Sequence, residues 1–442
     1  MLLSPAIRFR RFTVLLSCLG LALAFSIVDS PPARATTTEP ALVINHDFPD
    51  PDVSQFGSTY YAFSTNNSRG NVPTATAPAA TGPWTDGPDA LPTLGGWAGS
   101  GQTWAPDVSK LATGSYLLYY VAHSTSAGRQ CIGTATASAP TGPFTPASQP
   151  LVCNAAEGGD IDPSSFVDAS GSRYLVYKND GNAIGQPPSI WLQPVAANGT
   201  TLTGARTKLL TNDRADEGGV IEAPVIVQRA TRYVLFFSAN GYGGDAYLTS
   251  YATSASLTGP YTKAYRPLMT TAGFDGAVRG PGGADIVGNK IVFHGWINSY
   301  SARGVYVAAL GWASDLPVVR GSRVRYEAER GTLTDCVARD DAGASGGQVA
   351  ARIDNPDSSV QLSVYAPVAG GYTAHVVYAA GYGDAQQTLS VNGGTGTVVS
   401  LPDHGWEHFV DADVDLSLVA GWNTLRFTHR TAYAELDYLE IA

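Results

Sequence analysis

A long repeat runs five times along this chain of 442 residues. Each unit opens at or near a proline, and the openings read Asp50-Pro51, Ala105-Pro106, Asp162-Pro163, Ala223-Pro224 and, without the proline, Gly-Gly-Ala-Asp at 282–285. Each unit then has a short apolar run that is rich in aromatic residues, as at 116–121. A second marker, Thr-Gly-Pro-aromatic-Thr, follows at 81–85, 141–145 and 258–262, with a degenerate copy at 203–207. Two markers in the same order indicate one structural unit used repeatedly.

The repeat predicts an all-β fold. Short aromatic segments between Gly and Pro turns are typical of strands, and apolar residues do not recur at the spacings of three and four that mark helices. Units of this length suggest the four-stranded blades of a propeller. A solenoid is the alternative, but five units followed by a change in composition favour a closed ring, which leaves no exposed sheet edges. We therefore expect a five-bladed β-propeller.

The propeller markers stop near residue 317. Residues 317–323 read as a linker, and from 324 to 442 short alternating segments return between Gly-rich turns, for example at 360–364. This pattern is typical of a β-sandwich. We therefore expect a propeller domain at 36–316 followed by a β-sandwich (jelly-roll) domain at 324–442.

Residues 1–35 have the pattern of a secretory signal peptide. Arginines precede an apolar stretch at 12–27, and Ala33-Arg34-Ala35 forms a small-x-small cleavage site. The apolar stretch is interrupted and shorter than the roughly 20 residues that a membrane anchor needs. The sequence therefore predicts a secreted protein that is not bound to a membrane.

Three cysteines follow this segment. Cys131 and Cys153 lie in the second unit and flank its Thr-Gly-Pro marker, so in an oxidising compartment they are the natural disulfide pair. Cys336 stands alone in the second domain, where we expect a small buried side chain.

The formal net charge of −10 argues against nucleic acid or an anionic membrane as a partner, because both need basic surfaces. A neutral ligand is the simplest fit, and we expect a monomer. The 8 Trp and 22 Tyr residues suit sugar rings, but propeller cores also use aromatic residues.

Three carboxylates, Asp50, Asp162 and Glu222, stand at the openings of units one, three and four. Equivalent positions in a propeller converge on one mouth of the central channel, so these acids should face one pocket. An Asp before Pro also starts turns, but this alternative does not explain Glu222, which is one residue further from its proline. Paired carboxylates with a neutral ligand point to glycoside hydrolysis. The chain has no zinc-type Cys/His spacing, phosphate-binding Gly loop or Gly-x-Ser-x-Gly motif, so we expect no catalytic cofactor.

The four openings with their flanks resemble the signature stretches of glycoside hydrolase family 43. They read HDFPDPDV at 46–53, WAPDV at 104–108, IDPS at 161–164 and IEAP at 221–224. The resemblance implies a five-bladed propeller that hydrolyses α-L-arabinofuranosides or β-D-xylosides with inversion. It assigns the general base to Asp50, the pKa modulator to Asp162 and the general acid to Glu222, with Asp52 as an adjacent rival for the base.

The same resemblance implies further site residues. Trp104 would form a wall of the sugar subsite, and His294 would lie in the central channel near a bound cation. A hydrogen-bonded core histidine is an equally good interpretation of His294. Asn179, in Lys-Asn-Asp-Gly after the third-unit strand, could bind sugar hydroxyls, although this is also a turn sequence.

The C-terminal segment resembles carbohydrate-binding modules of families 6 and 35. The resemblance implies a structural Ca²⁺ held by Glu327, Glu329 and Asp437, which are hard oxygen ligands. Many relatives place Asn as a ligand contact two residues before the late Asp, where this chain has Glu435. Trp406 is the candidate stacking platform for a sugar, with Tyr382 beside it as a second.

Together these features predict a secreted inverting glycoside hydrolase that releases L-arabinofuranose from arabinan or other neutral plant cell-wall polysaccharide. A β-xylosidase, a galactan-cleaving enzyme and an inactive sugar-binding propeller are the alternatives.

Overall fold

The computed structural model describes Met1 and residues 39–442, so the predicted signal segment lies outside the described residues except for its first. The described part consists of strands and six short 3₁₀ helices, which are η1 (Ala155–Glu157), η2 (Gly181–Ile184), η3 (Ala215–Glu217), η4 (Ala272–Phe274), η5 (Ala328–Arg330) and η6 (Ser345–Gly347). No helix in the described part is long and apolar enough to cross a membrane.

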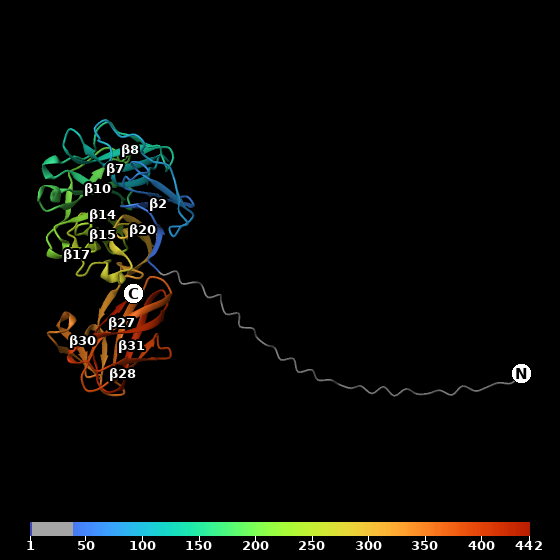
Figure 1. The fold of residues 1–442 in the computed structure, drawn as a ribbon, viewed down its shortest axis with the longest axis vertical. Helices are drawn as coiled ribbons and strands as arrows, with labels where there is room; N and C mark the ends of the chain where they lie inside the picture. The colour runs from blue at the N-terminus through green and yellow to red at the C-terminus, as the bar shows by residue number, and fades with distance from the viewer. Residues whose placement is uncertain (2–38) are drawn as a thin grey trace. The chain divides into compact units, whose positions relative to one another are not determined.

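Four sheets of the first domain each contain four consecutive antiparallel strands. They comprise β2 (Asp52–Phe56), β3 (Thr59–Phe63), β4 (Thr74–Ala77) and β5 (Thr85–Asp86); β6 (Trp104–Lys110), β7 (Tyr116–Ser124), β8 (Arg129–Ala137) and β9 (Thr145–Pro146); β10 (Asp160–Val167), β11 (Arg173–Asn179), β12 (Ser189–Val195) and β13 (Thr207–Thr211); and β14 (Ile221–Gln228), β15 (Tyr233–Ala239), β16 (Leu248–Ser254) and β17 (Thr262–Lys263). Figure 1 shows these sheets around a common centre. The predicted propeller blades are confirmed.

The fifth sheet joins both ends of the domain. It contains β18 (Arg279–Val287), β19 (Lys290–Ile297) and β20 (Ala302–Ala313), and its outer strand is β1 (Ala41–Ile44), which pairs with β20. The N-terminal strand therefore completes the last blade, which removes a free sheet edge. β21 (Leu316–Val319) also pairs with β20, so strand structure continues into the segment predicted as a linker.

The five unit openings share an unusual backbone conformation. Asp50, Ala105, Asp162, Ala223 and Gly283 all have a positive φ, between 39° and 57°. Non-glycine residues rarely adopt this region. A following proline disfavours the right-handed helical conformation of the residue before it, which leaves the positive-φ region open to the four openings that precede proline. Strand pairing is interrupted at these points in the second to fifth units. Each blade therefore begins with a local kink that presents its opening residue to the centre.

Carboxylates two residues after the openings tie neighbouring blades together. Asp52 accepts a hydrogen bond from the Val108 N–H (2.9 Å), Asp107 from the Ser165 N–H (3.0 Å) and Asp285 from the Val53 N–H (2.7 Å). Each bond joins the first strand of one blade to the first strand of the next. These buried acids therefore have a structural role in joining the blades.

The second domain is a sandwich of two antiparallel sheets, as predicted. One contains β22 (Val324–Glu327), β24 (Val337–Asp340), β25 (Gln348–Ala351), β27 (Gly370–Ala380), β30 (Gly405–Leu418) and β32 (Glu435–Ile441); the other contains β23 (Thr332–Thr334), β26 (Ser359–Ala366), β28 (Ala385–Val391), β29 (Thr397–Leu401) and β31 (Gly421–Thr431). Alternate residues such as Ala374, Val376 and Tyr378 point into a single apolar core. The remaining residues of each strand form the outer faces.

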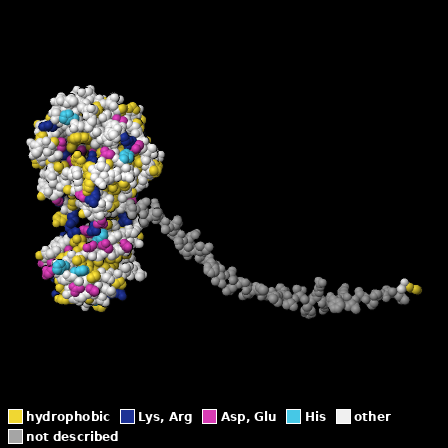
Figure 2. Space-filling view, viewed as in Figure 1, with side chains coloured by type: hydrophobic (Ala, Val, Ile, Leu, Met, Phe, Trp, Pro, Cys, Tyr) yellow, Lys and Arg dark blue, Asp and Glu magenta, His cyan; other side chains and the backbone are white. Residues whose placement is uncertain are grey.

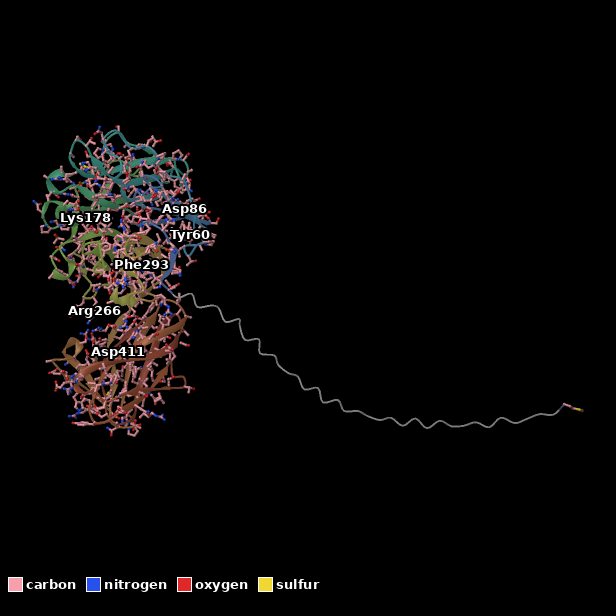
Figure 3. The ribbon with its side chains drawn as sticks, in the orientation of Figure 1. Tyr60, Asp86, Lys178, Arg266, Phe293 and Asp411 are labelled. Atoms are coloured by element: carbon pink, nitrogen blue, oxygen red, sulfur yellow. A yellow bond between two sulfur atoms is a disulfide. The ribbon has the colours of Figure 1, made fainter. Side chains whose placement is uncertain are left out.

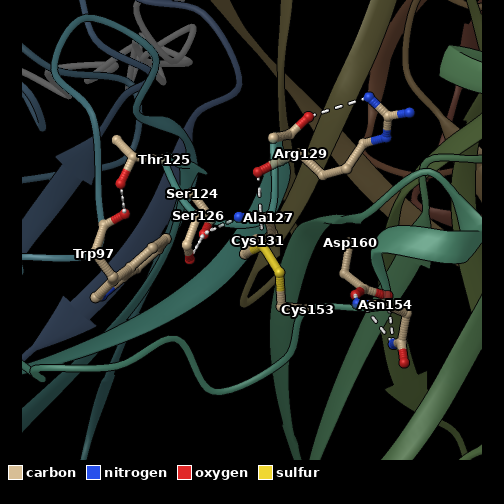
Figure 4. The surroundings of a disulfide bond; sticks show 11 residues. Trp97, Ser124, Thr125, Ser126, Ala127, Arg129, Cys131, Cys153, Asn154 and Asp160 are labelled. Carbon is tan, nitrogen blue, oxygen red and sulfur yellow. Dashed lines mark hydrogen bonds between the residues drawn. A yellow bond between two sulfur atoms is a disulfide. The ribbon is translucent and has the colours of Figure 1, made fainter.

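The predicted disulfide is confirmed. Cys131, on β8, is bonded to Cys153, with Cα atoms 4.7 Å apart (Figure 4). Cys336 is a free, partly buried cysteine whose thiol donates to the Ser359 carbonyl.

Candidate active site

A cavity of about 250 Å³ lies where the first strands of the five blades meet. Asp50, Asp162 and Glu222 all line it, together with Trp104. The structure thus brings together the three predicted carboxylates and the predicted sugar-wall tryptophan. Arg303, Tyr242 and Tyr247 complete much of the remaining wall.

Asp50 is held as an ionised carboxylate. Its Oδ1 accepts a hydrogen bond from the Arg303 guanidinium (3.0 Å), and its Oδ2 accepts one from the Thr65 hydroxyl (2.6 Å). Burial by itself would raise the pKa of Asp50, but the charge of Arg303 and these hydrogen bonds hold it below its ordinary value. A carboxylate that is ionised at neutral pH can accept a proton from water, as a general base must.

Asp52, the rival for this role, has the opposite electrostatics. It is 8% exposed and already accepts the Val108 N–H. Burial, together with the neighbouring Asp285 and Asp107 carboxylates, raises its pKa well above the ordinary value. A protonated carboxyl cannot act as a base, so the geometry favours Asp50.

Asp162 and Glu222 form the second half of the site. Asp162 accepts the Ala223 N–H through Oδ2 (2.9 Å), which fixes it beside Glu222. Glu222 accepts hydrogen bonds from Lys178 Nζ (2.9 Å) and from the Tyr247 hydroxyl (2.9 Å). Burial and the Glu222 carboxylate raise the pKa of Asp162 to about 8. Because the pKa of Asp162 lies above neutral pH, the pair Asp162 and Glu222 retains one proton there.

His294 lies behind Asp50 and does not line the cavity. It is fully buried and stacks on Tyr247, with ring centroids 5.7 Å apart. Its Nδ1 accepts the Asp50 N–H (3.1 Å), and burial lowers its pKa to about 3, so the ring is neutral. A neutral imidazole whose Nδ1 accepts carries its proton on Nε2. Neither nitrogen then has a free lone pair, so His294 does not fit as a direct ligand of the expected channel cation.

Asn179 was predicted to bind sugar, and the structure places it differently. Its Oδ1 accepts from the Ser189 N–H and from the Trp191 indole, and its Nδ2 donates to the Glu157 carbonyl. The side chain is buried and does not line the cavity. Asn179 is the last residue of β11, and its amide ties this strand to β12 and to η1.

Three cavity residues were not identified from the sequence. Arg303, on β20, pairs with Asp50; Tyr247, before β16, donates to Glu222; and Tyr242, which is 55% exposed, offers a ring at the wall. The Arg303 guanidinium lies 5.0 Å from the Tyr242 ring centroid. These residues stand outside the repeated positions, so no register signal marked them.

The predicted calcium ligands Glu327, Glu329 and Asp437 act on one another electrostatically, but they do not form a group whose ligand atoms lie within 4.8 Å of one another. Ser345 donates to Glu327 through its hydroxyl and to Asp437 through its N–H. Each of Glu327, Glu329 and Asp437 nevertheless keeps one buried oxygen without a hydrogen-bond partner. Burial and the Glu327 carboxylate raise the pKa of Asp437 to about 6. Three unpartnered hard oxygens fit a Ca²⁺ ion chemically.

Elsewhere on the sandwich, His375, Asp411 and Asp413 offer ligand atoms that all lie within 4.8 Å of one another (Asp411 is labelled in Figure 3). The group lies on β27 and β30. It is the one group of this kind among the described residues, and the predicted calcium ligands do not belong to it.

Trp406 belongs to an aromatic cluster with Tyr382 and Tyr433. Its ring centroid is 5.0 Å from that of Tyr382 and 4.9 Å from that of Tyr433. Tyr382 is 77% exposed, so part of the cluster faces solvent. Beside it, Glu435 is buried and paired with Arg339, and it accepts from the Tyr433 hydroxyl. Glu435 is therefore neutralised within the module, where many relatives have a ligand-binding Asn.

On the face drawn in Figure 2, Lys and Arg side chains are interspersed with Asp and Glu among uncharged groups. This mixed distribution agrees with a neutral ligand.

Comparisons with known proteins agree with this architecture. The model of glycosyl hydrolases family 43 matches residues 40–309, and that of carbohydrate binding module family 35 matches residues 324–442. The chain is 26% identical over 255 residues to a β-D-galactofuranosidase of Aspergillus niger (53% of this chain, 70% of the relative). It is 28% identical over 257 residues to a probable arabinan endo-1,5-α-L-arabinosidase A of Aspergillus flavus (54% and 76%).

Solved structures show the same fold. A thermostable family-43 glycoside hydrolase has a TM-score of 0.58 at 22% identity, covering 64% of this chain and 95% of its own. An exo-β-1,3-galactanase from Phanerochaete chrysosporium has a TM-score of 0.50 at 22% identity, covering 91% of this chain and 99% of its own. The chain belongs to glycosyl hydrolases family 43 and carries a family 35 carbohydrate binding module at its C-terminal end.

Proposed function

We propose that this glycoside hydrolase cleaves α-L-arabinofuranosides with inversion and releases L-arabinofuranose from arabinan or related plant polysaccharide. The observation that carries the proposal is one cavity in which an ionised Asp50 faces a carboxyl pair, Asp162 and Glu222, that retains a proton. An inverting glycosidase needs one carboxylate to activate water and one carboxyl to protonate the leaving oxygen. Curated relatives named as arabinan endo-1,5-α-L-arabinosidases support the choice of sugar.

In this mechanism, Asp50 takes a proton from a water molecule that attacks the anomeric carbon. Glu222 gives a proton to the glycosidic oxygen as the bond to the leaving group breaks. Asp162 modulates the acid, because repulsion between the two carboxyl groups disfavours ionisation of both and keeps one proton on the pair. Trp104 and Tyr242 provide the apolar walls against which a sugar ring can pack.

A substrate panel tests the proposal. We expect the full-length protein to hydrolyse p-nitrophenyl α-L-arabinofuranoside and linear arabinan. It should act on p-nitrophenyl β-D-xyloside and β-1,3-galactan more slowly, by about 10-fold or more, as expected of pocket discrimination. Proton NMR of fresh product should show the β-anomer of arabinose first. Preferred cleavage of another substrate would contradict the sugar assignment, and retention of configuration would contradict the mechanism.

A galactan-cleaving activity is the second candidate. The solved exo-β-1,3-galactanase covers nearly the whole of this chain, including both domains. That likeness concerns the fold, so the galactan arm of the same panel decides between the two activities.

We also propose that Glu327, Glu329 and Asp437 bind a structural Ca²⁺. Calcium should stabilise the sandwich by about 2.7 kcal/mol when its concentration is 100 times the dissociation constant. Calorimetry should therefore show a melting transition that moves up with Ca²⁺ and down with EGTA, and Asp437→Asn should lose this response. Asp413→Asn is the matched control, because it alters the His375 group instead. A calcium effect that disappears in the control but persists in Asp437→Asn would contradict the assignment.

A further inference from the structure

Lys178 is a fully buried lysine at the centre of the carboxylate site. It lies near the end of β11 (labelled in Figure 3), and its side chain has no exposed surface. Its Nζ lies 2.9 Å from Glu222 Oε2 and 3.3 Å from Asp180 Oδ1. Burying an ammonium group is costly unless ionised partners surround it. Its position next to Glu222 therefore requires negative charge on that side of the cavity.

Both oxygens of Glu222 are occupied by donors. Lys178 donates to Oε2, and the Tyr247 hydroxyl, which is 2% exposed as a residue, donates to Oε1. A carboxyl group that accepts hydrogen bonds through both oxygens has the arrangement of an ionised carboxylate. A protonated Glu222 would instead donate a hydrogen bond through one of its two oxygens.

Asp162 has the opposite arrangement. Only Oδ2 has a donor, the Ala223 N–H, and no cation is within bonding distance among the described contacts. The charged and titratable groups that act on this carboxyl are Glu222, Lys178 and Asp50. Arg303 is bonded to Asp50 on the other side of the site. Between Asp162 and Glu222, Asp162 is therefore the better place for the proton of the pair.

We propose that Lys178 is a positioning residue that holds Glu222 ionised and leaves the proton of the carboxyl pair on Asp162 until a sugar enters the cavity. The inference deepens the proposed function and rests on it for the catalytic step. The raised pKa of Asp162, about 8, is in accord with it. In the reaction, Asp162 gives up the proton of the pair, Glu222 receives it in exchange for one of its present hydrogen bonds, and Glu222 passes it to the glycosidic oxygen, so that the leaving group departs as an alcohol. The attacking water loses its proton to Asp50, which returns it to the pair through solvent.

A titration of the free protein tests where the proton resides. Infrared spectroscopy detects the C=O stretch of a protonated carboxyl, and no substrate is required. Asp52, Asp107 and Asp285 also have raised pKa values, so difference spectra against variants are needed. In wild type, we expect a C=O signal of a protonated carboxyl below pH 8 that disappears as the pH rises through about 8. In Asp162→Asn, this signal should be absent at every pH. A signal that survives in Asp162→Asn and disappears in Glu222→Gln would overturn the proposal.

Variants that remove or keep the positive charge of Lys178 test its role. Lys178→Met removes the cation that lowers the proton affinity of the pair, so the loss of the signal should move to higher pH by about 1–3 units. The alkaline limb of the kcat/KM profile should move in the same direction. Lys178→Arg keeps the charge and should stay near wild type, and Tyr247→Phe, which removes a neutral donor, should shift less than Lys178→Met. An unshifted Lys178→Met titration in a protein with wild-type circular dichroism would contradict the role.

The two proposals can fail separately. If wild type cleaves no arabinoside, the proposed function fails, while the infrared titration still reports the position of the proton. If Lys178→Met does not fold, the comparison of Asp162→Asn with Glu222→Gln decides the question, since both retain Lys178.

Discussion

Replacing Asp50 with asparagine is expected to lower kcat/KM by about 10²–10⁴-fold on every substrate that the enzyme cleaves. Asparagine keeps nearly the same shape and can still accept from Thr65, but it cannot take a proton from water. The quality of the leaving group does not alter this need. Initial rates on p-nitrophenyl α-L-arabinofuranoside and on arabinan should therefore fall together.

Two controls separate this result from misfolding. Azide is a nucleophile that needs no base, so it should restore turnover of the activated substrate and give an inverted glycosyl azide. Asp52→Asn is the matched variant, because burial and its acidic neighbours already favour the protonated form of Asp52. It should retain most activity. Activity that survives in Asp50→Asn and disappears in a folded Asp52→Asn would exchange the roles of the two residues.

The fold was predictable because the same opening and the same Thr-Gly-Pro marker recur along the chain. Five openings at similar spacing, four of them with a proline after the opening residue, indicated five blades, and the structure shows why they share a pattern. Each opening residue has a positive φ, and the last unit meets this requirement with Gly283 in place of a residue before proline. What the repeat could not indicate was the completion of the last blade by β1, since its pairing with β20 joins segments more than 250 residues apart.

The three carboxylates were predictable for the same reason. They occupy repeat positions, and their acidic character is absent from other units, so the blade itself does not need it. Arg303 on β20, Tyr247 just before β16 and Lys178 on β11 reach them from positions outside the repeated openings. Which residues contact the carboxylates depends on how the blades pack around the centre. The repeat pattern of a single sequence does not mark these residues. Asn179 shows the converse, because it adjoins Lys178 in the sequence and yet its amide binds the neighbouring β12 and η1.

Secretion and the monomeric state remain predictions from the sequence. The predicted signal segment lies outside the described residues except for Met1.

Glu222→Gln is expected to separate substrates by their leaving groups. On arabinan, whose leaving sugar alcohol needs a proton, kcat/KM should fall by about 10²–10⁴-fold. On p-nitrophenyl α-L-arabinofuranoside, the nitrophenolate departs without protonation, so the loss should be about 10-fold or less. The fold should persist, because glutamine can still accept from Tyr247 while Lys178 keeps its contact with Asp180. Rates on both substrates, measured with the same preparation, give the comparison.

The ratio of the two losses carries the information. A variant that merely disturbs the cavity lowers both rates alike, whereas loss of a proton donor spares the activated substrate. Asp162→Asn provides the contrast, since it removes the proton of the pair but leaves Glu222 in contact with Lys178. If Glu222→Gln lowers both rates equally while Asp162→Asn spares the nitrophenyl substrate, the acid is Asp162, whose pKa of about 8 already equips it to carry a proton at neutral pH.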